Sequence, residues 1–323
     1  MKDKIKNSPN IVVDIGARFG LHPTWKNFKS DTFFYLIDAD KNEIKRLKEK
    51  YKDKKGEMLF VNTVISDFKG SINFFNLSNP AMSGIYERKN ISPLFEGERK
   101  DQLKRKKSKV SSQSLNDFRN SISHHIDFLK IDTEGSEYVI LKDYKYFDEI
   151  IGIRTEISFD SAYKEKLPLE GSFSNIHKLL RKNNFILLNL DYEGRGDFFS
   201  DFLDSKQKYG VIQQTDAVWI KDPKVLLKQK DPIVTIKLIN FLFRNNAPDL
   251  ALFLLNKTFK ILKKISHTNH YDYAKFLTIK HFYSIKWSPN QKPNKHAQFY
   301  EKIFNSKYPK GHEYNGSNLF NPD

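Results

Sequence analysis

The sequence predicts an α/β protein in which a largely parallel, doubly wound sheet is followed by a helical C-terminal extension. Up to about residue 221, short and continuously apolar runs alternate with amphipathic stretches of helical period. Strands of that kind are typical of a parallel sheet that is covered by helices on both faces. Beyond residue 221 the strand pattern stops, and 323 residues suffice for one large domain and a smaller region.

The expected elements follow from apolar runs and the breakers between them. In the first predicted helix, residues 41–51, Ile44, Leu47 and Tyr51 share one face, and Asp40 precedes it as a capping residue. Further helices are expected from about residue 136 and over 175–182. Strands are expected over residues 10–15, 32–37, 58–65, 71–76, 127–131, 150–156, 185–190 and 217–220.

Two regions depart from this alternation. Residues 83–110 include the charge-dense run EGERKDQLKRKKSK, which is either a helix or a loop. After Lys221, DPIVTIKLINFLFRN and APDLALFLLNKTFKILKKI predict two amphipathic helices separated near Pro248, and the chain from about Trp287 onward looks irregular. We therefore expect a catalytic domain over residues 1–221 and a basic, mostly helical extension over residues 222–323.

The charge of the chain is uneven. The net charge is +16, of which residues 221–323 contribute +11, so we expect an anionic partner for this part. A lysine-rich composition without a binding role is the alternative. The absence of cysteine excludes disulfides and thiolate chemistry. The N-terminus MKDKIKNSPN lacks an apolar signal core, and no apolar run is long enough to span a bilayer, so we expect a cytoplasmic protein without a transmembrane segment.

The first candidate binding motif is NIVVDIGARFG, where an apolar strand delivers Asp14 and leads into a turn between Gly16 and Gly20. Glycines at such a turn allow a ligand to approach the backbone closely. A pyrophosphate-binding G-x-G-x-x-G motif is not formed, because Arg18 stands where its second glycine would be. The spacing instead suits an adenosyl amino acid, whose ammonium group favours a nearby carboxylate. A glycine turn beside a solvated Asp14 is the alternative.

The next strand ends in the segment FFYLIDAD, which places Asp38 24 positions after Asp14. A carboxylate at this position accepts hydrogen bonds from both ribose hydroxyls, whereas Asp40 is expected to cap the following helix. In VISDFKG, Ser66 and Asp67 leave the third strand where an adenine ring is expected.

A third motif, IDFLKIDTEGSEYVIL, gathers a lysine and three carboxylates at one strand end: Lys130, Asp132, Glu134 and Glu137. Catalytic groups in open α/β sheets lie at the carboxyl ends of strands. Like charges that lie close together also raise one pKa and so favour a general base. We expect the active site here; the alternative is that Glu134 and Glu137 only complement the dipole of the next helix.

Taken together, these motifs resemble the FkbM-type methyltransferase family over about residues 10–220. The matching segments are VVDIGARFG, LIDAD, VISDFKGSINFF, AMSGI, VSSQSLNDF, IDFLKIDTEGSEYVIL and DAVWI. The resemblance implies a Rossmann-like, mostly parallel class I methyltransferase sheet of seven strands, with S-adenosyl-L-methionine as cofactor. It also implies a hydroxyl group of a sugar or small natural product as acceptor. By the same resemblance, Asp14, Gly16, Ala17 and Gly20 hold the methionine part, Asp38 the ribose and Asp67 the adenine side.

The chain departs from the family pattern at two places on the rim of this site. Arg18 stands where the family commonly has Asn, and Asp38-Ala39 stands where it has Glu-Pro. Both departures leave a carboxylate and a glycine turn in place.

For the chemistry we expect direct methyl transfer to an acceptor oxygen, with catalysis mostly from positioning. Asp132 is the first candidate for the base and Glu156, at the end of the next strand, the second; Glu134 and Lys130 complete the candidate catalytic set. A divalent cation shared by these carboxylates remains an alternative, although no metal site is predicted.

The expected acceptor is a sugar hydroxyl in a glycan, a lipopolysaccharide or capsule precursor, or a related small molecule. Two alternatives remain. A nucleic-acid methyltransferase would use the basic, aromatic C-terminal part, although no base-reading motif is present. A non-catalytic module would bind cofactor and dock a glycan-assembly partner or an anionic membrane surface.

Overall fold

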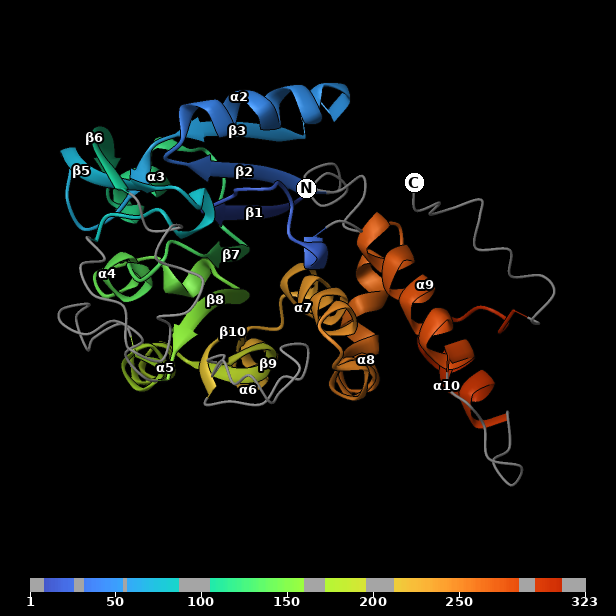
Figure 1. The fold of residues 1–323 in the computed structure, drawn as a ribbon. Helices are drawn as coiled ribbons and strands as arrows, with labels where there is room; N and C mark the ends of the chain where they lie inside the picture. The colour runs from blue at the N-terminus through green and yellow to red at the C-terminus, as the bar shows by residue number, and fades with distance from the viewer. Residues whose placement is uncertain are drawn as a thin grey trace, which may run out of the picture. The chain divides into compact units, whose positions relative to one another are not determined.

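The structure is a computed structural model that describes residues 9–25, 32–54, 57–86, 105–159, 172–195, 212–284 and 294–309. It divides into two compact units, which we describe separately (Figure 1). The sheet unit comprises residues 11–21 and 33–221. The helical unit comprises residues 1–10, 22–32 and 222–323.

The sheet unit is built on a seven-stranded sheet in the order β3-β2-β1-β7-β8-β10-β9. Strand β1 pairs in parallel with β7, β7 with β8, and β2 with β3, whereas β10 runs antiparallel to both β8 and β9. The prediction of a mostly parallel, seven-stranded class I methyltransferase sheet is therefore confirmed. The strands span Asn10–Ile15 (β1), Thr32–Asp38 (β2), Met58–Asn62 (β3), Phe128–Ile131 (β7), Gly152–Ser158 (β8), Phe185–Arg195 (β9) and Ile212–Lys221 (β10).

A second, three-stranded sheet has the order β4-β6-β5, with β4 at Val64–Ile65, β5 at Gly70–Leu77 and β6 at Arg105–Gln113. The predicted single strand over residues 58–65 is wrong, because the chain leaves the large sheet at Thr63. The Thr63 backbone N–H donates to the Asp38 carbonyl at 3.2 Å, and its hydroxyl donates to the Ser111 carbonyl on β6 at 3.2 Å. Of the charge-dense run, residues 96–104 lie outside the described residues. Residues 105–109 belong to strand β6, so the expectation of a helix or a loop is wrong there.

In the described part of the sheet unit, α-helices lie at Lys41–Lys50 (α2), Leu115–Ser121 (α3), Glu137–Leu141 (α4) and Phe173–Lys182 (α5). Asp40 caps α2 as predicted, because its side chain accepts the backbone N–H groups of Asn42 and Glu43. The core on one face of the large sheet is continuous and apolar, with Val13, Leu129 and Ile153 completely buried on adjacent strands. Successive side chains of a strand point to opposite faces of the sheet, so the charged side chains of these strands lie on the face opposite this core.

The helical unit contains α6 (Pro223–Gln229), α7 (Pro232–Arg244), α8 (Pro248–Leu262), α9 (Asn269–Ser284) and α10 (Asn294–Phe304). An N-terminal segment belongs to the same unit: Trp25 stacks on Phe241 of α7 with ring centroids 5.8 Å apart, and Arg244 donates to the Thr24 carbonyl at 3.1 Å. Among the helices that the structure describes, none is both long and apolar enough to cross a membrane.

The expectation of an irregular chain after Trp287 is wrong for residues 294–304, which form α10. Tyr300, Ile303 and Phe304 on this helix are buried. Their spacing is helical, but the surrounding Asn, Lys and His residues obscure it in the sequence.

Candidate active site

A pocket opens at the carboxyl ends of β1, β2, β4 and β7, where ligand sites of open α/β sheets are found. Its floor includes Gly16, Asp38 and Asp132, and a facing wall is formed by Pro80, Ala81, Ser83, Gly84 and Ile85. As far as the structure describes the lining, it also includes Glu134 but not Asp14, Ala17, Gly20, Lys130 or Glu156. The structure thus brings the ends of three predicted motifs together in one cavity.

The turn after β1 has a backbone conformation that requires glycine at two positions. Gly16 and Gly20 have φ values of +80° and +95°, which L side chains rarely adopt. A Cβ atom on Gly16 would collide with the carbonyl oxygen of Asp132, and one on Gly20 would collide with the Tyr51 hydroxyl. The backbones after β1 and β7 are therefore in direct contact, and the pocket floor is backbone at this point.

Behind this turn lies a buried chain of charges. Asp14 is completely buried, and the Lys130 ammonium lies 3.2 Å from its carboxylate and 3.3 Å from that of Asp132. Burial raises the pKa of Asp14, an effect that the charge of Lys130 opposes. Burial alone would lower the pKa of Lys130, but the charges of Asp14 and Asp132 hold it above its usual range. Lys130 therefore stays charged and connects Asp14 to the pocket through Asp132.

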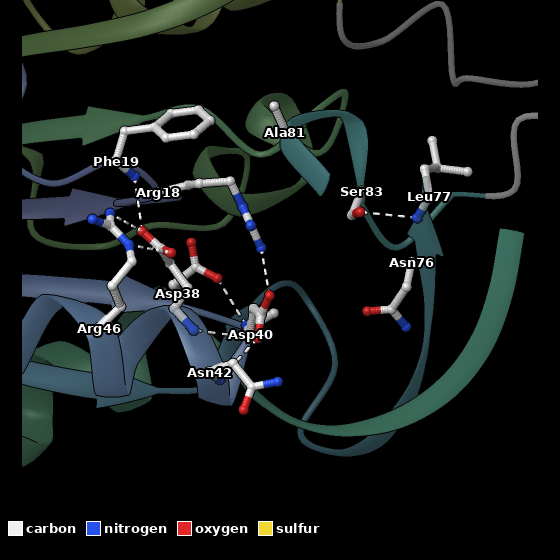
Figure 2. A network of polar contacts seen from close by, with 12 residues as sticks. Arg18, Phe19, Asp38, Asp40, Asn42, Arg46, Asn76, Leu77, Ala81 and Ser83 are labelled. Carbon is white, nitrogen blue, oxygen red and sulfur yellow. Dashed lines mark hydrogen bonds and ion pairs between the residues drawn. The ribbon is translucent and has the colours of Figure 1, made fainter. Parts of the chain in front are cut away.

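Asp38 lies at the end of β2 in a hydrogen-bonded network (Figure 2). Its carboxylate accepts the Asp40 backbone N–H at 2.8 Å, and the Asp40 carboxylate in turn accepts Arg18 at 2.8 Å. Asp38 is only 7% exposed, and this burial raises its pKa to about 6, although the bond from Asp40 and the charge of Arg18 act in the opposite direction. Arg18, a departure from the family pattern, thus joins the glycine turn to the start of α2.

A cluster of three carboxylates lies beside the pocket. Asp132 and Glu134 follow β7, Glu156 lies on β8, and each offers an oxygen within 4.8 Å of those of the other two. Burial and then the negative charges of Glu134 and Asp132 raise the pKa of Glu156 well above its ordinary value. A group of this kind takes up a proton readily. The same oxygens are the ligand type that a hard divalent cation prefers.

Two neighbouring features explain how this cluster is held in place. Glu137 is buried and accepts the Thr133 backbone N–H at 2.8 Å and its hydroxyl at 3.0 Å, so it holds the turn that presents Glu134. Arg154, which the sequence analysis missed, is buried beside Lys130 in the β7–β8 register and pairs with Asp216 at 3.3 Å. The sequence signal for Arg154 is its place two positions before Glu156, directly after the apolar run Ile150 to Ile153.

The two residues expected near adenine lie outside the lining as described. The buried Ser66 hydroxyl is 2.8 Å from that of Ser112, and Asp67 pairs with Lys142 at 3.0 Å. The residues just before them, Val64 and Ile65, do line the pocket. The facing wall at residues 80–85 corresponds to the segment AMSGI, to which the sequence analysis assigned no role.

The sheet order and the glycine turn at the strand ends define a class I, S-adenosylmethionine-dependent methyltransferase. The Methyltransferase FkbM domain matches residues 14–187, more than half of the chain, so the protein belongs to the FkbM methyltransferase family. S-adenosylmethionine is therefore its cofactor. No curated protein matches the chain.

Solved structures show only distant likeness. A protein of Pyrococcus horikoshii that is provisionally named an RNA methyltransferase is 11% identical with a TM-score of 0.34, the match covering 69% of this chain and 77% of that one. TrmK of M. capricolum, solved with S-adenosyl-homocysteine, is 11% identical with a TM-score of 0.31 and coverages of 93% and 92%. TYW2 of M. jannaschii, solved with AdoMet, is 13% identical with a TM-score of 0.28 and coverages of 68% and 74%. With TM-scores this low, these likenesses assign no substrate to the chain.

Proposed function

We propose that the protein transfers the methyl group of S-adenosylmethionine to a hydroxyl oxygen of a sugar, in a glycan or in a lipopolysaccharide or capsule precursor. The observation that carries this proposal is the cluster of Asp132, Glu134 and Glu156 beside the cofactor pocket. Carboxylates can bind sugar hydroxyls and also accept the proton that an alcohol loses on methylation.

The residues of the pocket fit the cofactor. The floor at Gly16 is bare backbone, which allows a ligand to lie against it, and Asp38 is a buried carboxylate fixed by a single backbone bond from Asp40. We assign the ribose hydroxyls to Asp38. The methionine part is assigned to the turn of Gly16, Ala17 and Gly20 with Asp14 behind it. The adenine side is assigned to the end of β4, where Val64 and Ile65 line the pocket just before Ser66 and Asp67.

When bound, S-adenosylmethionine supplies an electrophilic methyl group on a sulfonium. Glu134 would hold the acceptor hydroxyl in line, and Asp132, or Glu156 as the second candidate, would take up its proton when the oxygen accepts the methyl group. The products are a methyl ether, S-adenosylhomocysteine and a protonated carboxylate. Lys130 keeps the Asp132 carboxylate in position through its 3.3 Å contact.

The test compares Asp132→Asn and Glu156→Gln with the wild-type protein. We expect the variant that removes the base to lose about 10²- to 10⁴-fold in turnover while its Kd for S-adenosylmethionine is retained. Unchanged turnover in Asp132→Asn would remove that residue from the mechanism. Turnover that is lost on chelation and restored by magnesium would instead assign the cluster to a divalent cation.

We further propose that residues 1–221 form the catalytic domain and that the basic extension, residues 222–323, helps to recruit an anionic acceptor in the cytoplasm. Lys263 and Lys302 both lie over the Phe259 ring, at 5.7 and 5.5 Å from its centroid. Because aromatic rings beside lysines also bind nucleic acid, RNA methylation is the second candidate function. Binding to RNA that falls steeply with salt, together with methyl transfer to RNA, would favour it.

A non-catalytic role is the remaining alternative. It predicts binding of S-adenosylmethionine without methyl transfer to any glycan fraction, and docking to a glycan-assembly partner or to vesicles that contain anionic lipid.

A further inference from the structure

Phe19, in the turn after β1, has a conformation that a large side chain rarely adopts. Its φ is +72°, in the left-handed region, and its side chain is 69% exposed to solvent. A left-handed backbone is unfavourable for a bulky residue, and water contact is unfavourable for a phenyl ring. A residue with unfavourable features of this kind is retained only where the surrounding structure holds it in place, and such residues cluster at ligand sites.

Two side chains of helix α2 hold the Phe19 backbone, one at its N–H group and one at its carbonyl group. The Phe19 backbone N–H donates to the Glu43 carboxylate at 3.0 Å, and its carbonyl accepts the Lys50 ammonium at 2.9 Å. Glu43 is itself held by two bonds from Arg46, at 2.9 and 2.6 Å (Figure 2). The backbone of Phe19, and with it the direction of its Cα–Cβ bond, is therefore held by side chains of α2.

Phe19 lines the same pocket as Gly16 and Asp38. Pro80 and Ala81 of the facing wall and Glu134 of the carboxylate cluster line this pocket together with Phe19. Figure 2 shows the ring directed away from the polar contacts of Asp38 and Asp40. The lining thus combines an exposed aromatic residue with carboxylates.

We propose that Phe19 is an acceptor-binding residue whose ring stacks on the apolar C–H face of a sugar. This inference rests on the proposed function and assigns its substrate to one subsite. A pyranose has a C–H face that gains by leaving water against an aromatic ring, and outward hydroxyls that suit carboxylates such as Glu134. Because the network already holds the Phe19 backbone before binding, only the side-chain torsions of the ring lose freedom when the sugar stacks on it.

The experiment measures saturation transfer by NMR from protein saturated with S-adenosylhomocysteine to three probes: methyl α-D-glucopyranoside, methyl α-D-mannopyranoside and methyl α-L-rhamnopyranoside. Phe19→Ala and Phe19→Gly are compared with wild type and with Phe253→Ala. Phe253 is the matched control, because it is 50% exposed on α8 and does not line the described pocket.

We expect the wild type and Phe253→Ala to saturate the ring C–H protons of at least one glycoside. Both Phe19 variants are expected to lose about fivefold of that signal, while their Kd for S-adenosylhomocysteine stays within about twofold. Phe19→Gly separates binding from folding, because glycine adopts φ of +72° without strain. Its Tm should equal or exceed that of the wild type.

Three outcomes would overturn the inference. Equal saturation in Phe19→Gly and wild type would mean that the ring does not contact the sugar. A parallel loss of S-adenosylhomocysteine binding would assign the ring to the cofactor. No saturation of any glycoside by the wild type would exclude sugar stacking, and methyl transfer to a glycan fraction, measured separately, would then show whether the proposed function still stands.

Discussion

The raised pKa of Asp38 makes cofactor binding sensitive to acid. Burial raises this pKa to about 6 in the free protein, and Asp38 is assigned to the ribose hydroxyls. Ribose hydroxyls donate to a carboxylate, so the cofactor prefers the ionised form, and binding must lower the pKa of Asp38. The affinity for the cofactor is therefore highest above the pKa of Asp38 in the free protein, and it decreases as the pH falls through about 6.

The size of this effect can be worked out from the ionised fraction. At pH 5 about one Asp38 side chain in eleven is ionised, so the Kd for S-adenosylmethionine should rise about tenfold relative to pH 8. Asp38→Asn keeps a neutral acceptor but loses the charge-assisted bonds, a difference of about 1 to 1.5 kcal/mol. We therefore expect its Kd at pH 8 to be about tenfold weaker and to change little with pH.

Isothermal titration calorimetry from pH 5 to pH 8 measures both effects. Asp53→Asn, which changes an exposed aspartate in the short 3-10 helix after α2, is the matched control and should reproduce the wild-type profile. A wild-type Kd that is constant from pH 8 to pH 5, or wild-type affinity in Asp38→Asn, would refute the assignment of ribose to Asp38.

Three further predictions concern the charges and the turn around the pocket. Gly16→Ala should lose at least about 2 kcal/mol of unfolding free energy in urea, together with cofactor binding, because its Cβ meets a backbone carbonyl. Lys130→Met should lower the free energy of unfolding by about 3 to 5 kcal/mol, because it leaves Asp14 buried without its cation. Adding Asp14→Asn to this variant should restore part of that stability. Arg18→Ala should move the acid midpoint of cofactor binding above that of the wild type, since the charge of Arg18 lowers the pKa of Asp38, and Arg18→Lys should return it part of the way.

Each of these predictions has an outcome that contradicts it. Wild-type stability of Gly16→Ala would mean that the contact between the two turns is not as close as described. If Asp14→Asn destabilises Lys130→Met further, the two side chains do not compensate each other. An unchanged acid midpoint in Arg18→Ala would show that Arg18 affects neither the charge nor the position of Asp38.

The sheet was predictable because its strands are buried on both faces and so appear as continuous apolar runs. The strand ends then indicated where Gly16, Asp38 and Asp132 would emerge, and these residues line one pocket in the structure. The break at Thr63 was not predicted, because only Asn62 and Thr63 interrupt the apolar run and neither is a strong breaker such as Gly or Pro, yet the chain passes there from one sheet to the other.

Side-chain partners were harder to predict than strand positions. The pairing of Lys130 with Asp14 depends on the register between β1 and β7, and the burial of Arg154 depends on that between β7 and β8. Neither register is visible in a single sequence. The position of Phe19 depends on a positive φ at a residue that is not glycine, which sequence rules assign to glycine or asparagine.

The most direct test of the proposed activity follows the methyl group itself. The protein and its Asp132→Asn variant are incubated with methyl-¹³C S-adenosylmethionine and a cell extract, which is then separated into glycan and nucleic-acid fractions for ¹³C NMR. We expect a methoxy signal in the glycan fraction with the wild-type protein and its loss in the variant. A methyl signal on nitrogen in the nucleic-acid fraction, with none in the glycan, would contradict the proposal and favour an RNA methyltransferase.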